Sequence, residues 1–419
     1  MREPAPRSGT AGPTPRWSLI IALQASNGLS SLGNSMVWLA LPWLVLEFTG
    51  SVAAAGITVA VSSAPGALAA PLAGWAVDRF GRRTVSIVAD LLSAIAVVGI
   101  PIAAAIDRLS LGVIIGLAVL GATFDPAGYT GRKALIVDVA RESRFNTDRL
   151  NGIHEGIFAL GFAVGPLVAA GSIALFGPIA TFWLPGIAFI LAAGMIALLR
   201  VSDAGQQARA DAIASGETLG GFWATIGLGF AIVWRDRLLR AMTVALLVLS
   251  AIYLPTETVI LPAYFESLSS PWGLGFVLAA MSAGGVLGGF AYGWLTARLS
   301  RLVIARTALF GVCIAVLVMA LLPPLPMLIA AGFALGLFWG PMAPLINTLV
   351  QRRVAPDAQG RVFGLQLSLF YAAPPIGMLL SGLAIESYGL AATYLIAAGL
   401  LALTALLVGF ARTIHDINN

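Results

Sequence analysis

Twelve long apolar runs, separated by short polar intervals, constrain the fold of this chain more than any other feature of its sequence. About 20 apolar residues in a helix cover the ~30 Å hydrocarbon core of a bilayer. Each run is therefore predicted to be a membrane-spanning helix, and the fold class is an all-α polytopic membrane protein with two six-helix bundles. The first six runs are roughly Trp17–Leu46, Val52–Ala73, Thr84–Ile106, Leu109–Gly131, Gly152–Phe176 and Ile179–Leu199. The second six are roughly Leu238–Phe265, Trp272–Leu295, Leu302–Leu322, Met327–Val350, Val362–Ile385 and Leu390–Ala411.

The composition agrees with a protein that lies in a bilayer. Hydrophobic residues make up 59% of the chain and charged residues only 10%, with a mean hydropathy of +0.93; soluble domains have about 25% charged residues. The net charge of +5 does not indicate nucleic acid, because the basic residues lie between apolar runs rather than on one soluble face. The expected partners are a lipid bilayer, a small-molecule substrate and protons, with no nucleic acid, and the chain is expected to be a monomer.

The placement of the basic residues predicts which loops face the cytoplasm. When both tails and every second loop are assigned to one side, all of the 24 Lys and Arg residues except Arg108 fall on that side. Short loops rich in Lys and Arg stay cytoplasmic, because translocating them is unfavourable. Both termini are thus expected in the cytoplasm of a multi-pass protein of the inner (plasma) membrane. The first run is too long for a cleavable signal peptide, so it is expected to act as its own insertion signal.

The two groups of six runs repeat one another. The segment GWLTAR at 293–298 echoes GWAVDR at 74–79, and RVFG at 361–364 echoes RLNG at 149–152. Parallel repeats of this kind are typical of transporters built from two bundles. The predicted domains are a cytoplasmic tail (1–16), a six-helix bundle (17–200), a cytoplasmic linker with an interfacial helix (201–237), a second six-helix bundle (238–411) and a cytoplasmic tail (412–419).

The linker carries an apolar residue at every fourth position, at Phe222, Ile226, Phe230 and Trp234. This spacing is typical of an amphipathic helix that lies at the membrane surface. The alternative is that the stripe packs on the bundle.

A short charged segment, GWAVDRFGRR at 74–83, stands between the second and third runs. It resembles the signature loop between helices 2 and 3 of the major facilitator superfamily. Within that superfamily, the chain is similar to the branch that contains macrolide and enterobactin exporters, through the combination of this loop with Phe124-Asp125-Pro126, Gly220–Leu239 and the segment 360–364.

The resemblance implies a conformational latch that holds the two halves together in the outward-facing state. The alternative is that the arginines only enforce orientation. Our candidate acidic partner for Arg79 is Asp125. The latch residues are Gly74, Asp78, Arg79, Gly81, Arg82 and Arg83.

The fifth run contains the residues Gly152, Gly161, Gly165 and Pro166, followed by two alanines. This spacing resembles the antiporter motif of the superfamily, which marks exporters, although the alanines replace a final glycine pair. Small residues allow close helix contact, and proline bends a helix. The alternative is that Gly and Pro are common in any membrane helix.

A polar stripe runs along one face of the first run, because Gln24, Asn27, Ser31 and Asn34 are three or four residues apart. The resemblance implies that helices 1, 4, 7 and 10 line a central cavity. The stripe is then a predicted substrate wall, and the residues predicted to face it are Tyr253, Thr256, Trp339 and Asn347. The alternative is hydrogen bonding between helices without ligand contact.

Four acidic residues fall within or near the apolar runs, namely Asp90, Asp125, Glu155 and Glu257. An ionisable side chain in a membrane is a functional hypothesis by default, and burial helps such an acid to take up a proton. Glu257 is the favoured proton carrier because it lies between two prolines, where a kink is expected, with Asp125 and Asp90 as further candidates. The alternatives are a solvated acid for Glu257 and structural pairs with arginines for the others.

The sequence lacks the parts of common enzyme sites. Its two histidines, His154 and His415, do not suffice for a His-based metal site or a catalytic triad. It contains no P-loop, and Lys133 is its only lysine. A single cysteine, Cys313, excludes an intrachain disulfide. The chain is therefore expected not to be an enzyme and to bind no metal and no cofactor. Any transport is expected to run on an ion gradient or down the substrate's own gradient.

Together these features predict export of an amphipathic small molecule by proton antiport through alternating access. One departure from the resemblance is expected. The arginine that drug antiporters carry deep in helix 4 is missing, because Arg132 and Lys133 are placed at the cytoplasmic end of the fourth run. The alternatives are an importer of a small solute, which a small and densely polar cavity would favour, and a membrane scaffold without transport.

Overall fold

The computed structural model describes residues 16–199, 201, 230–354 and 356–418. Within its helices, some side chains also lie outside the described set, at 67–75, 78, 79, 148, 351, 356–361, 363, 364, 367, 368, 371, 413 and 418. The predicted interfacial helix falls mostly on 202–229 and so lies outside the described residues. Its last part is helical, and there the exposed rings of Phe230 and Trp234 stack 5.0 Å apart.

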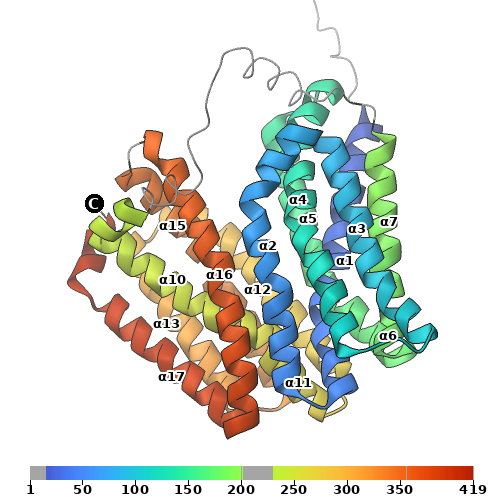
Figure 1. Ribbon diagram of the computed structural model, residues 1–419. Coiled ribbons are helices and arrows are strands. Elements are labelled where there is room, and N and C mark those ends of the chain that lie inside the picture. Colours follow the sequence, from blue (N-terminus) through green and yellow to red (C-terminus); the bar gives the residue numbers. More distant parts are fainter. Residues whose placement is uncertain (1–15, 200, 202–229, 355, 419) are drawn as a thin grey trace, which may run out of the picture.

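The described chain is helical and divides into two halves (Figure 1). The first half contains α1 (Trp17–Thr49), α2 (Val52–Phe80), α3 (Arg82–Ala105), α4 (Leu111–Ser143), α5 (Thr147–Phe176), α6 (Pro178–Thr181) and α7 (Trp183–Leu198). The second half contains α10 (Arg237–Pro255), the π-helical turn η1 (Thr256–Ile260), α11 (Leu261–Ser267), α12 (Pro271–Thr296), α13 (Arg301–Ala320), α14 (Leu325–Trp339), α15 (Met342–Arg353), α16 (Pro356–Tyr388), α17 (Leu390–Gly409) and the 3-10 helix η2 (Arg412–Asn418).

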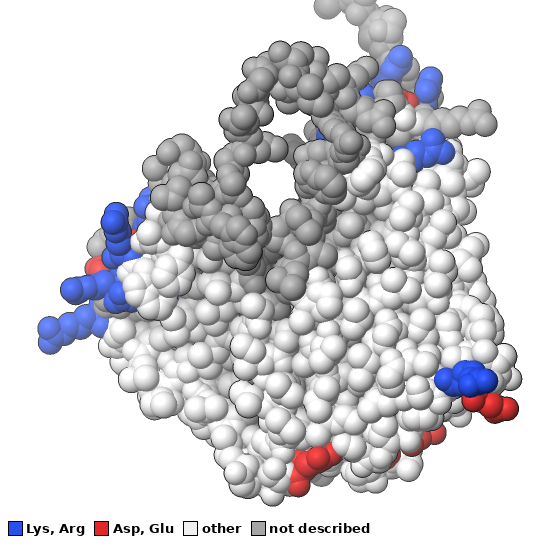
Figure 2. Space-filling model, viewed as in Figure 1, with Lys and Arg blue, Asp and Glu red and all other residues white. Residues whose placement is uncertain are grey.

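Among the described residues, ten helical segments are long and apolar enough to cross a membrane. They coincide with ten of the twelve predicted runs. The other two runs fall on α2 and α16, whose side chains are described only in part, although the first part of α2, Val52–Gly66, is a shorter apolar helix. Figure 2 shows a broad uncharged surface, with most Lys and Arg at its upper end and most visible acids along its lower end. A belt of exposed apolar side chains of this kind is typical of a surface that contacts lipid.

The helix α4 is longer than the fourth apolar run, and this corrects the expected position of Arg132. The helix continues for twelve residues beyond Gly131 and ends at Ser143. The reason is that Leu135, Ile136 and Val139 are fully buried against a second cluster of apolar residues from α1 and α7. Arg132 therefore lies inside the bundle rather than at a cytoplasmic helix end.

The seventh run is interrupted where its two prolines predict a kink. It consists of α10, the π-helical turn η1 and α11, with Pro255 at the end of α10 and Pro262 at the second position of α11. Proline removes a backbone donor, and π-helical turns occur where the helical hydrogen-bond ladder is disturbed. Glu257 lies in this turn.

The two halves contact each other where α2 begins and α16 ends, and where α5 packs on α12. A Cβ atom added to Gly56 would lie 2.7 Å from the carbonyl oxygen of Met378 in α16. The Ser51 hydroxyl and the Ala53 amide of α2 both donate to the carboxylate of Glu386, the amide at 3.1 Å. Figure 1 shows α2 and α16 side by side along this contact.

The last described residues are docked on the second half rather than free. Ile414 and Ile417 in η2 are both buried, and Arg353 joins the main chain of η2 to Asp236, with an ion pair of 3.0 Å. Asp236 also caps α10 by accepting two backbone amides. Partial burial raises the pKa of Asp236, but those amides and the guanidinium outweigh it, so its pKa lies below the usual value.

Candidate transport site

A cavity of about 730 Å³ lies between the two halves. Its wall is mostly apolar and rich in aromatic rings, and ligand pockets for drug-sized molecules have volumes of about 300–1,000 Å³. The first half contributes the larger part of the wall, with Asn34, Val37, Trp38, Leu41, Pro42, Val59, Ser62, Ser63, Gly66, Ser93, Ala96, Val97, Ile100, Leu117, Ala118, Gly121, Ala122, Asp125, Pro126, Tyr129, Thr130, Arg132, Lys133, Phe158, Phe162, Phe182 and Phe189. The second half contributes Leu254, Thr258, Phe370, Pro374, Pro375 and Met378.

Three aromatic rings form a continuous row along one side of the cavity. The rings of Tyr129 and Phe158 are 5.1 Å apart, and those of Phe158 and Phe162 are 5.0 Å apart. Tyr129 comes from α4 and the two phenylalanines from α5, where a spacing of four residues places both on one helix face. The rings are tilted against one another, by 57° and 35°, and all three belong to the cavity wall.

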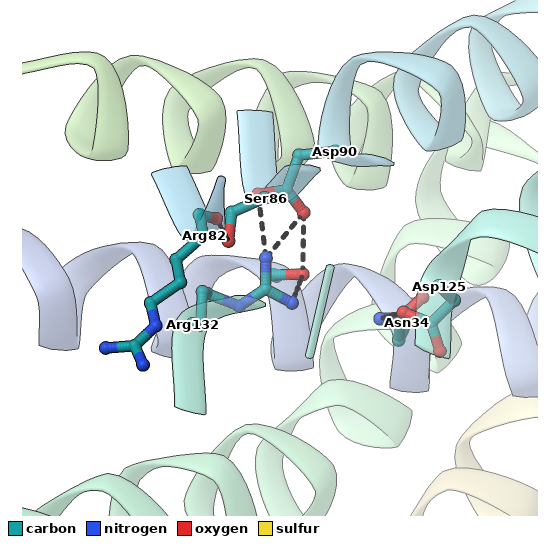
Figure 3. A network of polar contacts seen from close by, with 7 residues as sticks. Asn34, Arg82, Ser86, Asp90, Asp125 and Arg132 are labelled. Carbon is teal, nitrogen blue, oxygen red and sulfur yellow. Dashed lines mark hydrogen bonds and ion pairs between the residues drawn. The ribbon is translucent and has the colours of Figure 1, made fainter. Parts of the chain in front are cut away.

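Asp125 is the acidic residue of the cavity wall. It lies in α4 directly before Pro126, and its Oδ1 accepts a hydrogen bond of 2.5 Å from the Asn34 amide of α1 (Figure 3). The predicted contact with Arg79 cannot be compared, because that side chain lies outside the described residues. The polar contact that the structure gives Asp125 is therefore with a neutral donor.

The wall residue Arg132 forms a buried ion pair with Asp90, which is not itself part of the cavity wall. The Nη1 atom of Arg132 lies 2.8 Å from both carboxylate oxygens of Asp90, and its Nη2 donates to Ser30 at 2.8 Å. The Ser30 hydroxyl donates in turn to Asp90 at 3.0 Å, which closes the network drawn in Figure 3. Both charged side chains are only 3% exposed. Breaking one side of such a pair leaves an uncompensated buried charge.

A second basic residue of the wall, Lys133, is also paired. Its Nζ lies 2.8 Å from the Glu155 carboxylate and donates to the Tyr129 hydroxyl at 3.2 Å. Both side chains of this pair are about half exposed. Glu155 thus lies in an ion pair at the edge of the cavity.

The predicted latch is described only in part. The burial of Gly74 and the side chains of Asp78 and Arg79 lie outside what the structure describes. Gly81 adopts a positive φ of 90° at the turn between α2 and α3. Arg82 pairs with Asp138 of α4 at 2.9 Å. Arg83 donates to the last carbonyl groups of α7. These two arginines therefore tie neighbouring helices of the first half together.

The polar stripe of α1 points in more than one direction. Asn34 lines the cavity, whereas the Asn27 amide donates to the backbone carbonyl of His154 at 2.8 Å. Ser31 donates to a carbonyl of its own helix at 3.1 Å, and Gln24 is 5% exposed. In this arrangement Gln24, Asn27 and Ser31 are buried side chains outside the cavity wall.

The glycines of the predicted antiporter motif bring α5 close to α1. A Cβ atom on Gly161 would overlap the Ser31 side chain, and one on Gly165 would overlap Ser35. Ser35 also donates to the carbonyl of Gly161 at 3.0 Å. Gly152 has open space around it, and the carbonyl of Pro166 faces α12 of the other half.

The cavity wall does not include the residues predicted on helices 7 and 10, namely Tyr253, Thr256, Trp339 and Asn347. Tyr253 is buried and stacks on Trp339, with 4.7 Å between the ring centroids. The centroid of the Trp339 ring lies 6.5 Å from that of the wall residue Phe370. The Thr256 hydroxyl donates to its own helix at 2.8 Å, and Asn347 is exposed. The Glu257 carboxyl group lies close to the Tyr253 hydroxyl.

Sequence reasoning offered a structural pair with an arginine as the alternative for Asp90, and the structure shows such a pair, but it did not identify Arg132 as the partner, and it missed the aromatic row. The apolar stripe at 135, 136 and 139 continues the helix past Arg132, and this signal places the arginine inside the bundle. No comparable signal predicts which acid it meets. Within the described part of the chain, no cluster of three or more His, Cys, Asp or Glu residues could hold a metal ion.

Comparisons with known proteins agree with this architecture. The sequence model described as "Major Facilitator Superfamily" matches residues 25–268 and 256–418. The chain is 38% identical over 373 residues to "Multidrug efflux pump Tap" of Mycobacterium tuberculosis, covering 88% of this chain and 87% of that protein. It is 21% identical over 411 residues to "Macrolide efflux protein A" of Streptococcus pyogenes, covering 96% and 98%. The solved structure of the nucleoside transporter NupG has a similar fold, with a TM-score of 0.75 at 12% identity over 93% of this chain and 98% of that chain.

Proposed function

The chain belongs to the Major Facilitator Superfamily and is a transporter, not an enzyme, and from this premise we propose that it exports amphipathic, drug-sized molecules by proton antiport. The observation that carries the proposal is the cavity of about 730 Å³ between the halves, with its aromatic wall. A small and densely polar cavity would favour an importer of a small solute instead. The relatives named as multidrug and macrolide efflux proteins support the same direction of transport.

The proposed topology has twelve membrane spans with both termini in the cytoplasm of the inner (plasma) membrane. The ten described spans, together with α2 and α16, supply the twelve. In the proposed topology both ends of the chain lie on the side of the basic loops, as the positive-inside rule requires. On this topology, the contacts between Ser51, Gly56 and Glu386 close the outer side.

The proposed cycle is alternating access between two halves that rock about the cavity. The structure then corresponds to an inward-facing state, since the halves contact each other at the outer ends of α2 and α16 and along α5 and α12. Asp78 and Arg79 are proposed to form the cytoplasmic latch of the opposite, outward-facing state, in which their side of the protein closes.

Glu257 is the proposed proton carrier. Asp90 is held by Arg132 in a buried pair that leaves it little freedom to exchange protons. Glu257 instead lies in the π-helical turn η1 of the seventh span, next to the Tyr253 hydroxyl. This hydroxyl can donate to the ionised carboxylate and can accept from the protonated carboxyl group. A change in the geometry of that turn would alter the surroundings of the carboxylate during the cycle.

The test is drug-dependent proton movement in proteoliposomes that contain the purified protein and a pH-sensitive dye. The wild type is expected to release a proton gradient when an amphipathic drug is added. Glu257→Gln is expected to abolish this coupling, while Glu266→Gln, an acid of the same helix outside the π-helical turn, retains it. If the dye signal of the wild type does not change when drug is added, the antiporter proposal is refuted and a scaffold without transport is favoured.

A further inference from the structure

We propose that the cavity accepts lipophilic organic cations and that the Asp125 carboxylate is their counter-ion. This inference rests on the proposed export function and adds the charge class of the substrate. It follows from the balance of charges around the cavity, from the single neutral partner of Asp125 and from the aromatic rings in the same cavity wall.

The charges in the cavity wall leave one negative charge without a partner. Three charged residues line the cavity, namely Asp125, Arg132 and Lys133. Arg132 is paired with Asp90 at 2.8 Å, and Lys133 is paired with Glu155 at 2.8 Å. Within the described part of the chain, no basic side chain forms an ion pair with Asp125. When all five groups are counted as ionised, the three wall residues and the paired acids Asp90 and Glu155 carry a net charge of about −1.

The same pairs argue against an anionic substrate. Arg132 directs both terminal nitrogens at Asp90 and Ser30, so these two nitrogens are already engaged. Lys133 is held between Glu155 and the Tyr129 hydroxyl. An anion would have to displace one of these acids and would also meet Asp125. A cation meets neither obstacle.

The surroundings of Asp125 hold the carboxylate in place without neutralising it. Asn34 donates to Oδ1 at 2.5 Å and thereby fixes its orientation toward the cavity. An ionised carboxylate has about four acceptor positions, so further positions can serve a ligand. Because the wall around it is mostly apolar, attraction to a bound cation is stronger than it would be in water.

The aromatic row selects the kind of cation. Phe158 and Phe162 present adjoining rings in the cavity wall, whereas the Tyr129 ring already has the Nζ of Lys133 5.3 Å from its centroid. Ring faces attract cations, most strongly when water is excluded. A small, strongly hydrated ion would lose its water without replacement in this apolar wall. A bulky cation with delocalised or shielded charge loses less hydration and buries apolar surface against the rings.

The experiment compares two ions of nearly the same shape and opposite charge. Binding of tetraphenylphosphonium and of tetraphenylborate to the purified full chain in detergent is measured by calorimetry at one fixed pH. The wild type is expected to bind the phosphonium at least roughly 10-fold more tightly than the borate. Tetraphenylphosphonium carries no exchangeable proton, so its binding does not require proton coupling.

Variants then locate the counter-ion. Asp125→Asn is expected to weaken phosphonium binding by roughly 10- to 100-fold, and Asp125→Glu to retain most of it. Asp107→Asn is the matched control, because Asp107 is exposed in the loop after α3, and asparagine tolerates its positive φ of 53°. Preferential borate binding by the wild type, or unchanged phosphonium binding by folded Asp125→Asn, would overturn the inference. If that variant does not fold, the two ions compared on the wild type decide.

Failure of this inference is distinguishable from failure of the proposed function. The same proteoliposomes are loaded with a neutral amphipathic drug, and drug-dependent proton release is recorded. Proton release with the neutral drug, without phosphonium binding, would refute the cation site but not the proposed export function. If neither compound causes proton release, the proposed export function itself is refuted.

Discussion

Adding one methyl group at Gly56 is expected to open the outer side of the protein. Gly56 lies in α2 at its closest approach to α16, and a Cβ atom there would be 2.7 Å from the Met378 carbonyl oxygen. Ordinary contacts begin at 3.4 Å, so Gly56→Ala requires the two helices to separate by about 0.7 Å. The obstacle is backbone, which cannot rotate away as a flexible side chain would.

The size of the effect follows from the cost of overpacking. An extra methyl group in a closely packed contact typically costs about 1–3 kcal/mol. The contact exists only when the outer side is closed, so this free energy shifts the equilibrium between the two states by about 5- to 150-fold. The outward-open state is then expected to gain population, because its outer helices are already separated.

The assay is the distance between spin labels across the outer side. Thr49→Cys and Ser387→Cys place labels beside the contact on opposite halves, in a Cys313→Ala background. The parent protein is expected to give mainly a short distance, and Gly56→Ala to add a longer one. Gly194→Ala in α7 is the control, because a Cβ atom there meets nothing within 4 Å. A distance distribution unchanged by Gly56→Ala would refute the outer contact as a closed gate.

Three further predictions concern single contacts. Asp90→Asn should lower the free energy of unfolding by about 3–5 kcal/mol, measured by thermal denaturation, because it leaves Arg132 buried without a counter-charge; the double variant with Arg132→Gln should recover part of the loss. The pKa of Asp236 in the folded protein lies below its usual value. Its helix-capping contacts and its ion pair therefore stabilise the fold at pH values above the pKa that Asp236 has in the unfolded chain. This stabilisation is lost as the pH falls through the pKa of Asp236 in the folded protein. The melting temperature of Asp236→Asn should therefore fall less between pH 5 and pH 3 than that of the wild type, and an equal fall would contradict this. Gly165→Val should separate α5 from α1 at Ser35 and reduce transport and stability together, whereas loss of transport at full stability would indicate a different role.

The features that depend on neighbours in the chain were predictable. Ten of the apolar runs coincide with described helices, and the break of the seventh run lies between its two prolines. The glycines at 161 and 165 mark a close helix contact, as small residues at that spacing predict. Each of these features follows from hydrophobicity, backbone restriction or residue size within one segment.

The pairing of the charged residues was not predictable in the same way. Arg132 was expected at a helix end, yet it meets Asp90, 42 positions away, while Asp125 meets Asn34, 91 positions away. Three of the four polar residues on one face of α1 also lie outside the cavity wall that the fourth one lines. These outcomes depend on where each helix ends, how it is rotated and which neighbour it crosses.

The sequence by itself determined that the chain has a row of apolar helices, where they break, and which loops carry the positive charge. Those properties depend on the transfer of a segment into lipid, which needs no knowledge of its neighbours. Only the tertiary structure decided that two basic residues of the cavity wall are neutralised and that Asp125 is not. Ion pairs depend on distances between different helices, and those distances exist only after the helices have packed.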